Sequence, residues 1–145
     1  MGSRGHQEIE HTADMGLKGW GPDLESAFEE VAEAVFELMA DIEGLEEEFT
    51  IQVSCEEDSM DDLLVEFLNT VLTGLDLEEA VGIRAEVERF RNRGGTYFLT
   101  SVVHCVRIEN AKDRLLQEVK AATSYGADVR KTEQGSWEAL CVVDM

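Results

Sequence analysis

The chain has 145 residues, with 32 Asp or Glu against 12 Lys or Arg, so its formal net charge at pH 7 is −20. A surface of this charge repels phosphate backbones, which excludes direct non-specific binding to nucleic acids. Its hydrophobic fraction of 43% is that of a globular domain, and no apolar run approaches the about 20 residues of a membrane span. We expect one soluble domain whose partner is a basic protein or a cation, although the charge also fits a surface that serves only solubility.

The cysteines and the first residues bear on the cellular compartment. Cys55, Cys105 and Cys141 are widely separated and lie in apolar stretches. We expect each to be a small core residue, because none has a second Cys or a His at metal-ligand spacing. The opening MGSRGHQ lacks the apolar core of a signal peptide. Together these features predict a cytoplasmic protein.

Two short strands and a helix are predicted at the start of the chain. Residues 7–12 and 15–20 are typical of strands that bend around Ala13 and Asp14. Residues 21–43, GPDLESAFEEVAEAVFELMADIE, predict an amphipathic helix that starts near the proline and carries its glutamates on the solvent face. The apolar stripe of this helix comprises Leu24, Phe28, Val31, Val35, Leu38 and Ile42.

A strand and a second helix follow. Residues 49–55 alternate apolar and polar side chains, which predicts a half-buried strand. Ser59, with Asp62 three residues later, is a typical helix start, and apolar residues recur at helical spacing up to Leu75.

The remainder of the chain reads as two hairpins. Residues 82–90 and 96–108 flank the turn NRGG, and residues 118–132 and 136–145 flank a second turn. Between the hairpins, Leu115 and Leu116 belong to a short helical or irregular link. Two helices among about seven strands predict an α+β fold with a largely antiparallel sheet system covered by the helices.

Few residues carry recognisable chemistry. The sequence has no P-loop, no dinucleotide-binding glycine motif, no H-E-x-x-H and no G-x-S-x-G, so catalysis is poorly supported. We expect His104 to be a structural strand residue. His11 shares a turn with Asp14, and that turn is open to two interpretations, an ordinary bend or part of a site. Asp144 follows two valines, so its carboxylate should be either solvated at the sheet end or neutralised by a cation.

Several of these stretches together resemble the archease family. The stretches are H-T-A-D at residues 11–14, M-x-D at residues 39–41, V-K-A-x-T at residues 119–123, and an Asp followed by one apolar residue at residues 144–145. The stretch DSMDDLLVEFLNTVL is similar to the family's second helix. The chain departs from many relatives at Ser124, Tyr125 and Gly126, where those proteins have a Tyr and then a His. The resemblance implies a single archease-like domain over residues 8–145, with residues 1–7 as a flexible N-terminal segment.

The resemblance also implies a divalent-cation site. Mapped onto this chain, its ligands are Asp14, Asp144 and oxygen atoms of Met145. Hard oxygen donors of this kind suit Ca²⁺ first, with Mg²⁺ or Mn²⁺ as alternatives. Lys120, His11 and Asp41 are the positions that we associate with activation or partner contact, with His11 shaping its turn rather than binding the cation.

The function that the resemblance implies is that of an accessory protein without catalytic activity. Archeases promote guanylylation and multiple turnover of an RtcB-type RNA ligase that joins tRNA exon halves. A protein chaperone or oligomerisation modulator of an RNA- or DNA-modifying methyltransferase is the alternative, and it would need an apolar docking patch. A small hydrolase that uses Asp14 and Asp144 with a metal ranks last, because no general base or substrate loop accompanies them.

Overall fold

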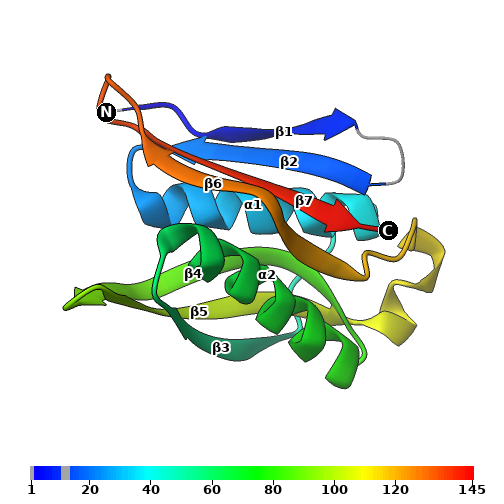
Figure 1. Cartoon of the computed structure of the whole chain (residues 1–145). Helices are drawn as coiled ribbons and strands as arrows, with labels where there is room; N and C mark the ends of the chain where they lie inside the picture. The colour runs from blue at the N-terminus through cyan, green and yellow to red at the C-terminus, as the bar shows by residue number, and fades with distance from the viewer. Residues whose placement is uncertain (1, 11–13) are drawn as a thin grey trace.

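The structure is a computed structural model that describes residues 2–10 and 14–145 (Figure 1). Within these residues the chain forms two α-helices and seven strands in two antiparallel sheets, so the predicted α+β class is confirmed. The elements in chain order are β1 (Gly5–Glu10), β2 (Asp14–Gly21), α1 (Leu24–Met39), β3 (Phe49–Glu57), α2 (Met60–Leu77), β4 (Ala80–Arg93), β5 (Thr96–Arg107), two short 3₁₀ turns, β6 (Ala121–Lys131) and β7 (Trp137–Asp144).

The helices form a middle layer between the two sheets. One sheet has the strand order β1-β2-β7-β6, and the other has the order β3-β5-β4. Helix α1 packs on β2 and β4, while α2 packs on β6 and β3, so each helix contacts both sheets (Figure 1). The sequence predicts helices that cover a sheet system. In the structure there are two separate sheets, and the helices pack against both of them.

The core lies where the two helices meet. The rings of Phe28 and Phe67 are stacked with centroids 5.9 Å apart, and both side chains are fully buried. Aromatic pairs at this spacing add to the free energy gained from burial. The predicted apolar stripes of both helices are buried, except that α1 ends at Met39 and Ile42 lies beyond it. Ala40 cannot continue the helix because it is extended and bridges Leu115.

Both helices begin as their sequences predict. Asp23 caps α1 by accepting a hydrogen bond from the amide of Ser26, and the Ser26 hydroxyl completes a capping box. Ser59 caps α2 by accepting a hydrogen bond from the amide of Asp62 at 3.0 Å. Such caps satisfy amides that have no partner inside the helix.

The first strand starts earlier than the sequence suggests. The strand predicted from residue 7 begins at Gly5 instead, so Gly5 and His6 also belong to β1, the edge strand beside β2. Side chains from this region are held by ion pairs to α1, namely Arg4 with Glu29 and Glu30, and His6 with Glu30 and Glu37. Apolar patterning could not reveal this attachment because it is made by charged residues.

The region of Ser124, Tyr125 and Gly126 is a bulge. The register of β6 on β7 shifts between Thr123 and Asp128, and Gly126 has a positive φ of 79°. Tyr125 is 83% exposed.

Among the described residues, no helix combines the length and the hydropathy that crossing a membrane would require.

Candidate functional site

Asp14 and Asp144 face each other across two neighbouring strands. Asp14 is the first residue of β2 and Asp144 is the last of β7, and the antiparallel register places the two directly opposite. Directly opposed side chains lie on the same face, with Cβ atoms about 4.5–5.5 Å apart in such pairs. The structure therefore brings together two acids separated by 130 positions in the sequence, 144 minus 14.

The environment of these two carboxylates favours a cation. Both residues are half-buried. Within residues 2–10 and 14–145, neither side chain forms a hydrogen bond or an ion pair with the protein. Opposed like charges destabilise a strand pair unless a counter-charge lies between them. Two oxygen donors in this arrangement fit a hard divalent cation.

Met145, the third predicted ligand, ends the chain next to Asp144. It follows Asp144 directly, is half-buried and packs its side chain against the core. This packing anchors the backbone just after β7. The predicted third ligand is thus the residue directly after one of the two paired acids, and its contribution to the site remains a prediction.

Lys120 is fixed to the same strand end. The backbone amide of Lys120 donates a hydrogen bond of 2.8 Å to the carbonyl oxygen of Asp144, and Lys120 is exposed to solvent. Ala121, the next residue, is the register partner of Asp144. Of the residues predicted for activation, Lys120 is therefore a neighbour of the predicted cation ligand Asp144.

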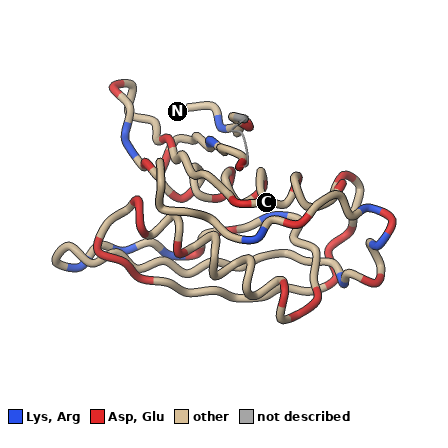
Figure 2. The backbone as a smooth tube through the Cα atoms, turned by 45° about the vertical axis from the view of Figure 1, so that its right-hand side comes forward, with Lys and Arg blue, Asp and Glu red and all other residues tan. Residues whose placement is uncertain are grey.

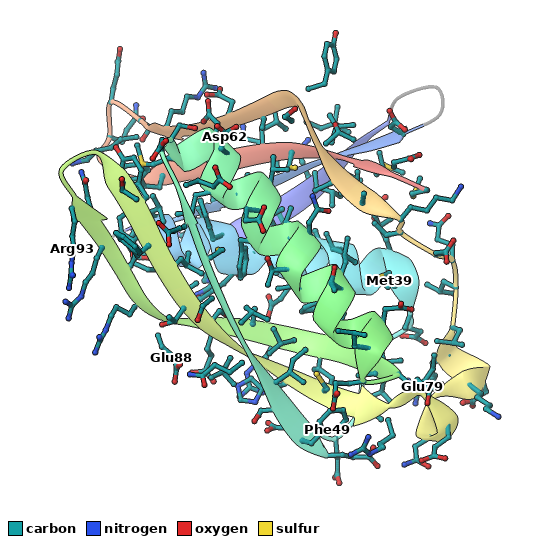
Figure 3. All side chains as sticks on the ribbon, turned by 60° about the horizontal axis from the view of Figure 1, so that its bottom comes forward. Met39, Phe49, Asp62, Glu79, Glu88 and Arg93 are labelled. Carbon is teal, nitrogen blue, oxygen red and sulfur yellow. The ribbon has the colours of Figure 1, made fainter. Side chains whose placement is uncertain are left out.

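A cavity of about 990 Å³ adjoins Lys120. Its apolar lining comes from the ends of both helices and the start of β4, whereas Asp76, Glu79 and Glu118 contribute carboxylates. Figure 3 labels two residues of this lining, Met39 at the end of α1 and Glu79 just after α2. The link from Leu115 to Ala121 lines one side, and Leu116 on that link is 63% exposed. The cavity could receive an apolar side chain of a partner beside a charged rim.

Asp41 lies near this region but outside the paired site. Its amide donates to the carbonyl oxygen of Arg114 at 2.9 Å, and the Arg114 guanidinium donates to the carbonyl oxygens of Asp41 and Glu43. These bonds tie the end of α1 to the link that leads to Lys120, at the end of the molecule where β7 ends (Figure 1). Among the described residues no bond joins the Asp41 carboxylate to Asp14 or Asp144. His11 lies outside the described residues.

The cysteines are core residues, as predicted. Cys105 and Cys141 are buried, and Cys55 is half-buried. Burial raises the pKa of each thiol to about 12, with smaller contributions from nearby glutamates at Cys55 and Cys105. Such thiols remain protonated at neutral pH and do not act as nucleophiles.

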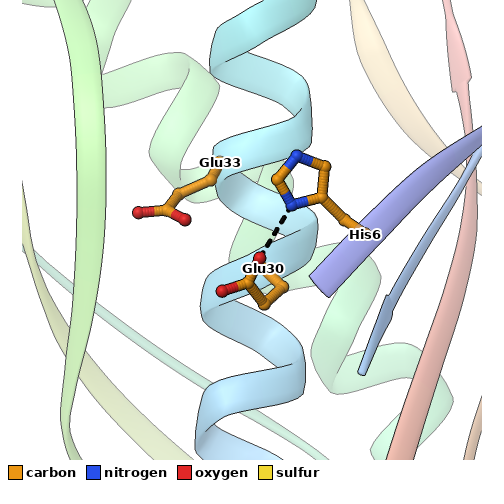
Figure 4. A group of neighbouring side chains, drawn as sticks. All are labelled: His6, Glu30 and Glu33. Atoms are coloured by element: carbon orange, nitrogen blue, oxygen red, sulfur yellow. Dashed lines mark hydrogen bonds and ion pairs between the residues drawn. The ribbon is translucent and has the colours of Figure 1, made fainter. Parts of the chain in front are cut away.

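Sequence reasoning missed a second cluster of charged side chains. His6 from β1 lies against Glu30 and Glu33 from α1 (Figure 4). Glu30 was expected on the solvent face of the helix, yet it is only 7% exposed, because β1 covers it. The spacing of Glu30 and Glu33 places them on one helix face, but nothing in the sequence links that face to His6.

Acidic residues are spread over the whole molecule, whereas Lys and Arg are few (Figure 2).

His104 is buried between Glu47 and Glu86, with its Nδ1 2.7 Å from Glu47 Oε1. Its contacts with two glutamates within the sheet agree with the predicted structural role.

Comparisons with known proteins identify the family and the fold of this chain. Residues 6–145 match the model of the Archease protein family (MTH1598/TM1083). The chain is 31% identical over 141 residues to protein archease of Pyrococcus furiosus and 33% identical over 141 residues to that of Thermococcus gammatolerans, covering 96% of this chain and 97% of each relative. The solution structure of Methanobacterium thermoautotrophicum protein 1598 superposes with a TM-score of 0.81 at 26% identity, covering 97% of this chain and 99% of the other. A Thermotoga maritima crystal structure shares the fold, with a TM-score of 0.59 at 16% identity over 96% of each chain.

Proposed function

Because this chain belongs to the archease protein family, we propose that it is a non-catalytic activator of an RtcB-type RNA ligase in tRNA splicing or RNA repair. The observation that carries the proposal is the register pairing of Asp14 with Asp144 beside Lys120. These are the positions at which the family resemblance expects the cation and the activating lysine.

The residues of the paired strand ends have separate roles in this mechanism. Asp14 and Asp144 hold a divalent cation, with Ca²⁺ favoured by the all-oxygen donors and Mg²⁺ or Mn²⁺ as alternatives. The cation, when bound, supplies positive charge that offsets the phosphate charge developing during guanylyl transfer. Lys120, exposed and fixed through its amide, brings an ammonium group to the same edge. The activator needs no nucleophile of its own, because the ligase supplies the histidine that is guanylylated.

Docking to the ligase would rely on charge and on the cavity. The net charge of −20 favours the basic mouth of an RNA-binding enzyme over RNA itself. The cavity beside Lys120 offers a place for an apolar anchor of the ligase, with Asp76, Glu79 and Glu118 available to basic neighbours.

The proposal is tested by reconstitution with a purified RtcB-type ligase, GTP, divalent metal and RNA ends that carry a 3′-phosphate and a 5′-hydroxyl. The parent protein should accelerate guanylylation and allow multiple turnovers at sub-stoichiometric ligase, with no ligation on its own. A variant that lacks Asp144 and Met145 should fold, because Val142 and Val143 still complete β7, and should not stimulate the ligase. Equal stimulation by the truncated protein would contradict the mechanism.

A chaperone or oligomerisation modulator of an RNA- or DNA-modifying methyltransferase is the second candidate. It is favoured by the apolar part of the cavity and by the exposed Leu115 and Leu116, and the Thermotoga maritima archease is described as a "possible chaperone". This function requires the apolar surface and no cation. A Leu116→Asp variant should therefore lose it, whereas an Asp14→Asn variant should retain it.

A further inference from the structure

A second group of cation ligands lies at the junction of β1 and α1, away from the paired strand ends. His6, Glu30 and Glu33 each offer one ligand atom, and these atoms lie within 4.8 Å of one another (Figure 4). Glu30 and Glu33 are one helical turn apart on α1, and His6 Nδ1 is 2.7 Å from Glu30 Oε1. Strand β1 and helix α1, which are separated by β2 in the sequence, thus bring an imidazole and two carboxylates close together.

The charges at this junction do not balance. The face of α1 beneath β1 carries Glu29, Glu30, Glu33 and Glu37. Arg4 contacts the first two, and His6 lies between Glu30 and Glu37. Among the described residues Glu33 has no hydrogen bond and no ion pair, although it is half-buried. Its pKa is raised, first by burial and then by the charge of Glu30. Arg4 and His6 thus face four carboxylates. Arg84, a further cation near these residues, pairs with Glu47 and Glu86 instead, so negative charge remains that a bound cation would neutralise.

An ion can reach these ligands from solvent. An open hollow of about 440 Å³ is lined by Arg4, Glu29, Glu30, Glu33 and part of β4, including Arg84. The Glu30 carboxylate is largely buried beneath β1, but it borders this hollow together with Glu33. The hollow connects the half-buried ligands with bulk water.

We propose that His6, Glu30 and Glu33 form a binding site for a divalent transition-metal cation such as Zn²⁺, which fastens strand β1 to helix α1. A nitrogen and two carboxylate oxygens suit Zn²⁺ better than Ca²⁺, which prefers oxygen alone. Ligand bonds of about 2.0–2.2 Å require donor atoms within about 4.4 Å of one another, so small side-chain rotations close the site. The present hydrogen bond between His6 and Glu30 is replaced when both bind the ion.

The other nitrogen of His6 already has the partner that a metal-binding imidazole requires. Its Nε2 lies 2.7 Å from Glu37 Oε1, so a neutral imidazole can donate there and keep Nδ1 free to bind the ion. Metal-binding histidines commonly donate their second N–H to a carboxylate, which fixes the orientation of the ring. Glu37 is therefore a positioning residue for this site.

The site is separate from the Asp14–Asp144 pair. His6 is the register partner of Gly19, five residues along β2 from Asp14, which corresponds to about 17 Å of extended strand. Its occupation would strengthen the attachment of the edge strand of the sheet, and it does not depend on the proposed ligase function.

The test is a Zn²⁺ titration of untagged protein by calorimetry and thermal unfolding, carried out in an Asp14→Asn background to remove the other site. This protein should bind one Zn²⁺ and gain thermal stability from it, because a ligand of the folded state stabilises that state. Adding His6→Gln or Glu33→Gln should weaken Zn²⁺ binding about tenfold or more. Adding Glu25→Gln, on the first turn of the same helix, should leave it unchanged.

Substitution of Co²⁺ gives a direct view of the ligands. The visible absorption bands of bound Co²⁺ should be lost in the His6→Gln protein and kept in the Glu25→Gln protein. Glu33→Gln is the more conservative change, because Glu33 forms no hydrogen bond or ion pair with a described residue. It keeps the test decisive if His6→Gln unfolds β1. The proposal is overturned if the Asp14→Asn protein binds no Zn²⁺, or if Glu33→Gln binds it as tightly as the background protein.

Discussion

Lys120 connects the two features that the proposed function uses. Its backbone amide binds the carbonyl oxygen of Asp144, and the residue also lines the cavity between the helix ends and the link. We expect Lys120→Ala to retain the fold, because removing an exposed lysine side chain changes the free energy of unfolding by no more than about 0.5 kcal/mol. Stimulation of ligase guanylylation should be largely lost, as measured by transfer of labelled GMP to the ligase.

Lys112→Ala is the matched control, since Lys112 is an exposed lysine of the 3₁₀ turn just before the link and lies outside the cavity lining. It should stimulate the ligase like the parent. Equal stimulation of the ligase by the two variants would show that Lys120 has no part in the mechanism. Unfolding of the Lys120→Ala variant would show that the role of Lys120 is structural.

At the level of single residues, the sequence was informative where a motif carried the information. Asp14, Asp144 and Lys120 could be named from short stretches, although only the resemblance joined them. Glu30 could not be recognised, because helical periodicity places it among solvated glutamates and the strand that covers it is held by Arg4 and His6. Long-range ion pairs leave no periodic pattern in a sequence.

Helix α1 can approach β2 closely because Gly19 has no side chain. A Cβ atom at this position would lie 2.5 Å from the carbonyl oxygen of Ala27 and 2.8 Å from the amide nitrogen of Val31, both backbone atoms of α1. Gly19→Ala should therefore force the helix away from the sheet and destabilise the fold by about 1–3 kcal/mol. Urea unfolding measures this loss. In Gly2→Ala the new Cβ makes only an ordinary 3.5 Å contact, so a similar loss there would contradict the explanation.

Strands β2, β7 and β6 are linked across their faces by charge. Lys18 Nζ lies 3.2 Å from Glu138 Oε2, and Arg130 Nε lies 3.3 Å from Glu138 Oε1. Burial alone would raise the pKa of Glu138, but the hydrogen bonds and charges of Lys18 and then Arg130 outweigh it and lower that pKa below 4.5. A lowered pKa in the folded state gives stability that is present above the unfolded pKa and is lost as the pH falls through the folded value.

Glu138→Gln should accordingly destabilise the protein at neutral pH by less than about 1 kcal/mol, since the pair is partly solvated. The difference in unfolding free energy from the parent should shrink as the pH falls below 4.5, the ordinary value for a glutamate. Urea unfolding at neutral and acidic pH measures it. A difference that grew on acidification would refute the assigned role of Lys18.

At the level of elements, local patterns predicted the helices and hairpins because their signals lie within short windows. Alternation revealed β3, and the turn at residues 92–95 revealed the β4–β5 hairpin. These local patterns could not predict that the strands divide into two sheets. It depends on pairing β2 with β7, which joins the two ends of the chain, and on helices that bury residues against both sheets.

For the whole molecule, the net charge of −20 should govern how fast it meets a basic partner. Attraction between opposite charges raises the association rate and is screened by salt, with a Debye length of about 10 Å at 0.1 M. The association rate with the ligase, measured by stopped-flow fluorescence, should fall steeply as salt is added. A rate that did not depend on salt would show that the acidic surface serves solubility rather than docking.

The central claim is that the paired ends of β2 and β7 hold a divalent cation, and calorimetric titration with Ca²⁺ tests it most directly. The parent should bind one Ca²⁺ at this site, while Asp14→Asn and Asp144→Asn should each lose binding by removing one of two opposed carboxylates. Asp41→Asn is the control, because Asp41 is an exposed acid just after the end of α1 and has no place in the pair. Ca²⁺ binding that is lost in the Asp14 and Asp144 variants and kept in the Asp41 variant is the predicted result. Equal binding by the parent and the Asp14 variant would contradict it.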